Sequence, residues 1–257
     1  MIGLSMTSYR GRTLEEFEGW LENVEKLGFD FVELVSEWPN FLTRETWKAY
    51  ADVLGSFDLK VTVHAPFSDV NIGSLNEKIR RTSLEILRET LDVASNLNAL
   101  VVTVHPGHCS PASRKFRGDY NRVHKSSLRE LEKYSREFGV LVGVENMPSF
   151  PILDVQMPER LAELLEGTGL GVTLDMGHLN TVGFPFGRFL ELLGRRIVHI
   201  HLHDNSGESD QHFPLGKGTI PWEKVLPRLR DFTWALEVTS IEDARASLDF
   251  LRDIGEL

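Results

Sequence analysis

The chain has 257 residues, 41% of them hydrophobic, which suits one sizeable core and a single barrel domain better than two small domains. Its net charge of −10 argues against a protein that coats nucleic acid through a broad basic face. The single cysteine, Cys109, excludes an intramolecular disulfide and favours a reducing compartment. No stretch approaches the roughly 20 apolar residues of a membrane span, and the first ten residues lack the apolar run of a signal peptide. We therefore expect a cytoplasmic protein without a membrane partner.

Short β-rich runs recur along the chain, and the segments between them have helical periodicity. The runs are Ile2–Met6, Phe31–Val35, Lys60–His64, Leu100–His105, Val140–Glu145, Gly171–Asp175, Ile197–His203 and Trp234–Glu237. Several are continuously apolar, as is typical of parallel strands buried on both faces. Thr13 is a suitable N-cap for the first helical segment, and Asn76–Leu97 predicts a longer helix with an apolar stripe.

Eight strand–helix units in a chain of this length predict an α/β fold that closes into a single (β/α)8 barrel. We expect residues 1–257 to form one such domain. A doubly wound open sheet is the alternative. The first run is not followed by a glycine-rich phosphate fingerprint, which disfavours a nucleotide-binding version of that sheet.

Residues that can bind metal recur at the ends of these runs. They are His64, His105, Glu145, Asp175 with His178 three residues later, His201, Asp210 and His212 after the seventh run, and Glu237. A single histidine or glutamate at a strand end is usually structural, but recurrence at six consecutive strands is poorly explained by coincidence. The C-terminal ends of barrel strands converge on one mouth. Imidazole and carboxylate together suit zinc, manganese, iron or cobalt, so we predict a divalent-metal site there.

The other histidines have weaker claims to a role in the site. His199 is expected deeper in the core or supporting the ligands, and His203 either supports them or contacts substrate. His108 and His124 are expected in or near a loop, solvated or beside substrate.

A basic stretch follows the fourth run and contains Arg114, Lys115, Arg117, Arg122 and Lys125. It is either a solvated surface or a phosphate-facing rim of the barrel mouth. After the second run, Trp38 and Phe41 either wall a substrate cleft or pack on the barrel rim.

The motifs HAPF, HPG, EN, LDMGH, HLHDN, DQHFPLGKG and LE occur in this order along the chain. As an ordered set they resemble the xylose isomerase-like TIM barrel superfamily, which includes sugar isomerases and epimerases and the endonuclease IV group. In the sugar epimerases, the resemblance implies one metal held by Glu145, Asp175, His201 and Glu237, with His178 touching substrate. In endonuclease IV, it implies a three-metal cluster that adds His64, His105, His178, Asp210 and His212.

The first hypothesis is a metal-dependent isomerase or epimerase of a small-molecule sugar or sugar phosphate. Glu145 and Glu237 would exchange protons with the reacting carbon through a metal-stabilised enediolate, and His178 would polarise a substrate oxygen. The expected cofactor is zinc, manganese or cobalt, as one to three ions. The first loop, TSYRGRT, and the second, SEWPNFLTRE, depart from the endonuclease IV pattern, which favours a small substrate.

The alternative is an endonuclease IV-like abasic-site endonuclease that hydrolyses phosphodiesters with the same metals, and only this alternative needs a nucleic-acid partner. A third hypothesis is a catalytically silent barrel that binds a metabolite. We also consider a homo-oligomer.

Overall fold

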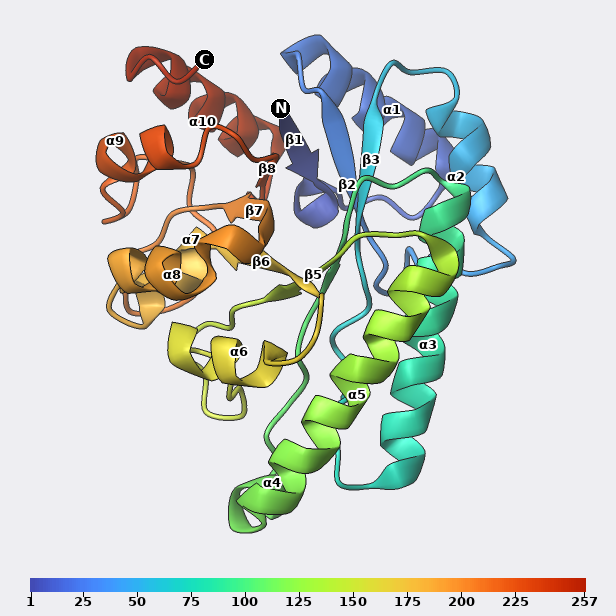
Figure 1. Ribbon diagram of the computed structural model, residues 1–257. Coiled ribbons are helices and arrows are strands. Elements are labelled where there is room, and N and C mark those ends of the chain that lie inside the picture. Colours follow the sequence, from blue (N-terminus) through green and yellow to red (C-terminus); the bar gives the residue numbers. More distant parts are fainter.

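The computed structural model describes residues 1–257, and its eight strands form a closed parallel barrel in chain order (Figure 1). The strands are β1 Ile2–Ser5, β2 Phe31–Val35, β3 Lys60–His64, β4 Val102–Val104, β5 Val142–Glu145, β6 Gly171–Asp175, β7 Ile197–Leu202 and β8 Trp234–Leu236. β8 pairs with β1 and closes the barrel, with Ile2 opposite Trp234. The predicted (β/α)8 barrel is confirmed, and the open sheet is excluded.

The helices lie outside the barrel (Figure 1). They are α1 Leu14–Leu27, α2 Trp47–Leu54, α3 Glu77–Asn96, α4 Pro111–Lys115, α5 Arg117–Phe138, α6 Pro158–Leu165, α7 Met176–Thr181, α8 Phe186–Leu193, α9 Trp222–Val225 and α10 Ile241–Asp253. Three short 3-10 turns are η1 Met6–Ser8, η2 Gly194–Arg196 and η3 Leu226–Arg228. No helix combines the length and the apolarity needed to cross a membrane.

The predicted helix starts are confirmed by their capping contacts. The Thr13 side chain accepts a hydrogen bond from the Glu16 backbone N–H, and the Glu16 carboxylate accepts one from the Thr13 N–H, which forms a capping box. α1 ends at Gly28, whose φ of 83° is the left-handed conformation that favours glycine. The Asn76 side chain caps α3 by accepting from the Lys78 N–H.

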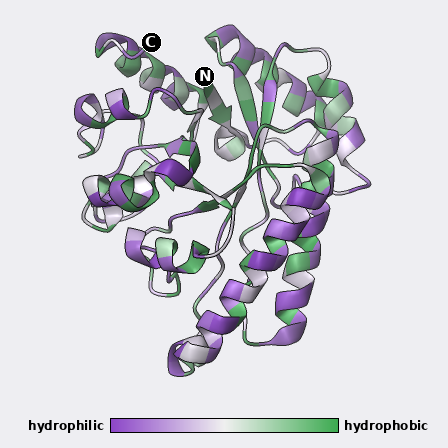
Figure 2. Cartoon of the chain, in the orientation of Figure 1, coloured by the Kyte–Doolittle hydropathy of each residue, from purple (hydrophilic) through white to green (hydrophobic).

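One continuous cluster of buried apolar side chains lies between the strands and the inward faces of the helices. The outward faces of α3 and α5 are largely hydrophilic (Figure 2). Inside the barrel, a fully buried polar group lies below the mouth and includes Glu33, Thr62, Thr103, Thr173 and His199. Buried polar groups are costly without partners, and these side chains partly satisfy one another, as Thr103 and Thr173 do at 2.9 Å.

Two strands end before their predicted ligands. β4 ends at Val104 and β8 at Leu236, so His105 and Glu237 are the first residues of the following loops. The strand periodicity still predicts their direction, because each directly follows a paired residue. Both side chains line a cavity at the barrel mouth.

Candidate metal centre

Four of the predicted ligands meet at one point. Glu145, Asp175, His201 and Glu237 each offer a ligand atom within 4.8 Å of the others, and all four side chains are buried. His201 Nδ1 lies 2.8 Å from Glu145 Oε1, 3.5 Å from Glu237 Oε1 and 3.8 Å from Asp175 Oδ2. The pairing of β6 with β7 places Asp175 directly opposite His201, and β8 pairs along the other side of β7. Barrel closure therefore brings residues from four adjacent strand ends together.

The chemistry of this group fits a divalent cation. Glu145 Oε2 and Asp175 Oδ2 are buried without a hydrogen-bond partner. Glu145 Oε2 lies 2.8 Å from His105 Nε2, yet the two atoms do not have hydrogen-bond geometry. Three buried carboxylates around one imidazole carry excess negative charge, which a bound cation would neutralise.

Three more histidines are oriented by backbone carbonyls. Nδ1 of His64 lies 2.9 Å from the Ala65 carbonyl oxygen, and Nδ1 of His178 lies 2.8 Å from that of Asn146. Nδ1 of His212 lies 2.6 Å from the Glu237 carbonyl oxygen. Because a carbonyl only accepts, each Nδ1 must carry the proton, and each Nε2 is left to face the mouth.

The remaining predicted ligands surround the first four. His64 groups with Glu145 and His201. Asp210 Oδ2 lies 3.2 Å from His178 Nε2 and 3.4 Å from His212 Nε2. The structure therefore brings all nine predicted positions to one mouth. It also shows a cavity of about 160 Å³ lined by Thr7, Val35, His64, Phe67, His105, Glu145, His178, Asp210, His212 and Glu237.

The two glutamates have opposite pKa shifts. Burial raises the pKa of Glu237, and the nearby Glu33 and Asp175 carboxylates raise it further against the pull of His201. Burial also acts to raise the pKa of Glu145, but His201 and His105 outweigh it and hold that pKa well below its usual range. Without a cation, the two carboxylates therefore favour different protonation states.

Two histidines beside these carboxylates, His178 and His212, are held in the charged form. Burial lowers the pKa of His178, but Asp175 and Asp210 outweigh it and raise that pKa well above the ordinary value. Burial also opposes protonation of His212, and its bond to Asp210 together with Glu237 raises its pKa to about 9. His178 is therefore a hydrogen-bond donor at the cavity when no cation is bound.

Sequence reasoning missed Glu33, a fully buried carboxylate on β2. Its Oε2 lies 3.1 Å from His201 Nε2 and 3.4 Å from His199 Nε2. A lone charged residue in the apolar run FVELV was the available signal. The expectation that His199 lies deeper in the core is confirmed. The residue is buried beside Glu33 and His201 and does not line the cavity.

His203 is fully buried and lies within the ligand cluster. Its Nε2 is 3.2 Å from Asp175 Oδ1 and 3.5 Å from Asp210 Oδ1, and the ring stacks on His212 with centroids 3.9 Å apart. Neither ring nitrogen has a hydrogen-bond partner. A Cβ on Gly177 would lie 1.9 Å from His203 Cε1, so this position requires glycine.

The structure corrects the expectation for His124. The residue lies within α5 rather than in or near a loop, and it is fully buried rather than solvated. The helix turns this side chain toward the Pro106 carbonyl, which is its hydrogen-bond partner. His108 is only partly buried and forms a bridge with Leu153.

The basic stretch lies beside, but not in, the cavity over the ligands. Arg117 pairs with Asp154, Arg122 with Asp119 and Lys125 with Glu166. These three basic residues lie on α5. Neither they nor Arg114 and Lys115 on α4 line the cavity described above. Nearby carboxylates therefore pair with three of the five basic side chains of this stretch.

The chain matches the xylose isomerase-like TIM barrel family over residues 21–254. It belongs to this family. An uncharacterised protein of Methanocaldococcus jannaschii is 32% identical over 252 residues, which cover 95% of this chain and 86% of that protein. A probable endonuclease 4 of Mycobacterium leprae is 28% identical over 245 residues, which cover 91% of this chain and 94% of the relative.

Solved structures of the family superpose over nearly the whole chain. The crystal structure of a D-tagatose 3-epimerase-like protein matches with a TM-score of 0.89 and 31% identity, covering 98% of this chain and 96% of that one. A Thermus thermophilus endonuclease IV matches with a TM-score of 0.73 at 23% identity and 98% coverage of both chains, which shows the shared fold alone. Family membership thus includes relatives named for two different reactions.

Proposed function

We propose that this protein is a divalent-metal-dependent isomerase or epimerase of a sugar or sugar phosphate. The observation that carries the proposal is the pair Glu145 and Glu237, two buried carboxylates that line one cavity of about 160 Å³ beside His201. A cavity of this size suits a small molecule. The similarity to a D-tagatose 3-epimerase-like protein over 98% of the chain supports the same reaction class.

The two glutamates are suited to exchange protons with a substrate carbon. General acid–base catalysis needs one group that holds a proton and one that accepts it, both within hydrogen-bond reach of the substrate. Both side chains line the same cavity, so both can reach a substrate held there. His178, with Nδ1 held by the Asn146 carbonyl, would direct an Nε2 proton at a substrate oxygen.

Glu145, Asp175, His201 and Glu237 would hold the ion. When bound, zinc, manganese or cobalt would supply Lewis-acid stabilisation of the negative charge that develops on substrate oxygens. The burial of all four side chains excludes water that would otherwise screen that charge.

An abasic-site endonuclease is the second candidate. The observation that favours it is the group His178, Asp210 and His212, which offers a further ligand set beside the first. The 28% identity to a probable endonuclease 4 supports it as well. This reaction would require DNA to approach the mouth of a chain with a net charge of −10.

The decisive experiment measures proton exchange at carbon. Protein purified without added metal is analysed for metal content, stripped with a chelator and reloaded separately with manganese, cobalt and zinc. Each form is incubated in deuterated water with ketoses and their phosphates, and NMR follows deuterium incorporation and new sugar isomers. An abasic-site duplex is tested in parallel.

The proposal predicts metal-dependent deuterium incorporation and isomer formation with at least one sugar of the panel. Cleavage of the abasic duplex at low enzyme concentration, with three ions per chain and no exchange on any sugar, would overturn it in favour of the endonuclease.

A further inference from the structure

A second cavity of about 340 Å³ adjoins the metal centre. Its lining residues come from the loops after β1 and β2 and are Met6, Thr7, Tyr9, Arg10, Gly11, Arg12, Val35, Glu37, Trp38, Pro39 and Asn40. Thr7 and Val35 also line the cavity above the candidate metal ligands. The Thr7 hydroxyl donates to the Val238 carbonyl, 3.1 Å away, which ties the first loop to the residue after Glu237. The two cavities therefore form adjoining parts of one mouth.

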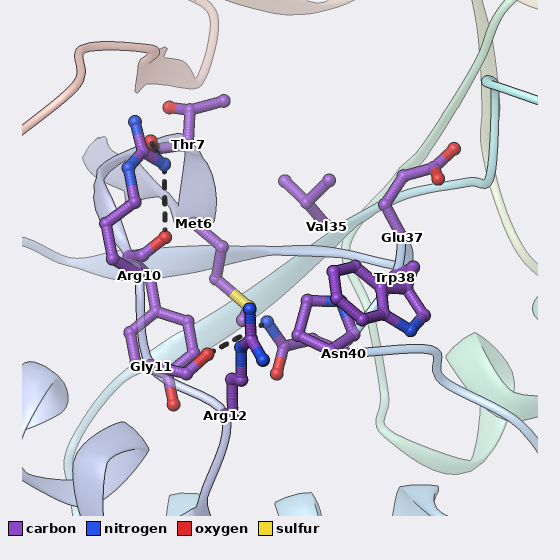
Figure 3. Close-up of a pocket in the computed structure, with 11 residues that line it drawn as sticks. Met6, Thr7, Arg10, Gly11, Arg12, Val35, Glu37, Trp38 and Asn40 are labelled. Atoms are coloured by element: carbon purple, nitrogen blue, oxygen red, sulfur yellow. Dashed lines mark hydrogen bonds between the residues drawn. The ribbon is translucent and has the colours of Figure 1, made fainter.

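This larger cavity carries positive charge in an acidic protein. Arg10 and Arg12 both line it, and neither forms an ion pair with a carboxylate (Figure 3). The one acidic lining residue is Glu37, whose Oε1 accepts hydrogen bonds from the backbone N–H groups of Phe67 and Ser68 at 2.6 and 2.8 Å. Figure 3 shows this carboxylate pointing away from both arginines. Neither guanidinium group is therefore in a direct ion pair, although the Glu16 carboxylate accepts a hydrogen bond from the Arg12 backbone N–H and lies near this side chain.

The two arginines differ in how they are held. Nη1 of Arg10 donates to the carbonyls of Thr7 and Tyr9 at 2.7 and 3.2 Å, so part of its hydrogen-bonding capacity serves the loop. The Arg12 side chain has no hydrogen-bond partner, and its guanidinium lies 5.1 Å from the centroid of the Trp38 ring. The Trp38 side chain is 69% exposed, which is unusual for so large an aromatic group. Arg12 is therefore positioned by stacking and retains its donors for a ligand.

We propose that this cavity binds the phosphate group of a phosphorylated sugar whose reacting carbons lie over Glu145 and Glu237. The inference rests on the proposed function, because it assigns the far end of the substrate of that site. Guanidinium groups bind phosphate through paired, charge-assisted hydrogen bonds. An unphosphorylated sugar would leave both arginines without an ionic partner, so the substrate class is the sugar phosphates.

The test is a binding titration that needs no turnover. Calorimetry in phosphate-free buffer measures the affinity of glycerol phosphate, a monoester, and of dimethyl phosphate, a diester. Each probe is titrated into the metal-loaded and the chelated protein. The variants are Arg12→Ala and Arg12→Lys, and Arg114→Ala is the matched control, because it removes an exposed arginine of the same barrel end that lines neither cavity.

Glycerol phosphate should bind the parent protein with or without metal, and dimethyl phosphate should bind more weakly. Arg12→Ala should weaken glycerol phosphate binding by about tenfold or more, since a hydrogen bond to a charged group is lost. The affinity of Arg12→Lys for glycerol phosphate should lie between those of the parent and Arg12→Ala, because lysine keeps the charge but lacks the paired donors of a planar guanidinium. The affinity of Arg114→Ala should equal that of the parent.

Equal affinities in the parent and Arg12→Ala, or no binding to the parent, would overturn the inference. Equal or tighter binding of dimethyl phosphate would overturn it in favour of a phosphodiester ligand. These outcomes are separable from the proposed function. Proton exchange on unphosphorylated sugars without glycerol phosphate binding would exclude this phosphate subsite and keep the proposed isomerase. Arg12-dependent binding of glycerol phosphate with no exchange on any sugar would keep the subsite and exclude the isomerase.

Discussion

Glu33 is expected to control how tightly the candidate centre binds metal. Burial acts to raise its pKa, but the adjacent imidazoles of His201 and His199 hold that pKa well below the usual range, so the carboxylate is ionised. An ionised carboxylate 3.1 Å from His201 Nε2 accepts the proton on that nitrogen. When a cation is bound, Nδ1 would therefore be the ligating nitrogen, facing the three carboxylates on the other side of the ring.

The Glu33→Gln substitution keeps the side-chain volume and removes the charge. Thr103 Oγ1 lies 3.5 Å from His201 Nε2, and this neutral hydroxyl cannot replace a charged acceptor. The glutamine amide oxygen can still accept from Nε2 but carries no charge. The loss is therefore at most the value of a hydrogen bond to a charged group, about 1.5–3 kcal/mol, which corresponds to roughly a 10- to 150-fold weaker metal complex. The effect of residues that support metal ligands is of similar size, about 10- to 100-fold.

The assay is competition with a chromophoric chelator for zinc and cobalt, together with the visible spectrum of the cobalt form. Glu33→Gln should raise the metal dissociation constant about tenfold or more and shift the cobalt bands. Glu37→Gln is the matched control, because its carboxylate serves the Phe67 and Ser68 backbone and does not touch His201. Parent-like metal affinity and spectrum in a folded Glu33→Gln variant would refute the reasoning.

Three further substitutions test other parts of the site and its support. Glu237→Gln should abolish proton exchange on substrate while circular dichroism and the melting temperature stay near those of the parent, because the amide cannot transfer the proton. Gly177→Ala should lower the free energy of unfolding by about 1–3 kcal/mol in denaturant titrations, because the new Cβ would lie 1.9 Å from His203 Cε1. Burial, assisted by Arg160, lowers the pKa of His124 to about 4, so the unfolded chain binds the extra proton first as the pH falls. Stability should therefore drop by about 3 kcal/mol between pH 6.5 and pH 4 through this residue alone, and His124→Gln should remove that share of the slope.

A specific result would contradict each of these three predictions. Parent-like exchange by metal-loaded Glu237→Gln would remove that residue from the chemistry. Unchanged stability of Gly177→Ala would mean that the His203 ring relocates freely. An identical pH slope in His124→Gln, measured against the parent in the same buffers, would mean that His124 is protonated as readily in the folded protein as in the unfolded chain.

The barrel and the position of its ligands could be predicted from local pattern. Continuous apolar runs identified strands buried on both faces. The Thr13 cap marked one helix start, and an apolar stripe predicted the helix from Asn76 to Leu97. Because parallel strands in a barrel share one C-terminal end, a ligand at the end of each run had to reach the same mouth. Strand periodicity sets the side-chain direction of the ligands at strand ends, such as His64, Glu145 and Asp175. His178, Asp210 and His212 lie outside the strands, and only the resemblance implied their place in a metal cluster.

What only the tertiary structure decided is which side chains meet across elements. Glu33 lies in an apolar run, and its role depends on β7 presenting His201 to the barrel interior. His124 is buried because one face of α5 packs on the loop after β4, which helical periodicity alone did not identify. Several basic residues of α5 pair with carboxylates, as Arg117 does with Asp154, 37 residues away along the chain, while Arg12 has no ion pair. Local sequence sets the direction of a side chain within its own element, but its neighbours, and therefore its charge and role, depend on how the barrel closes.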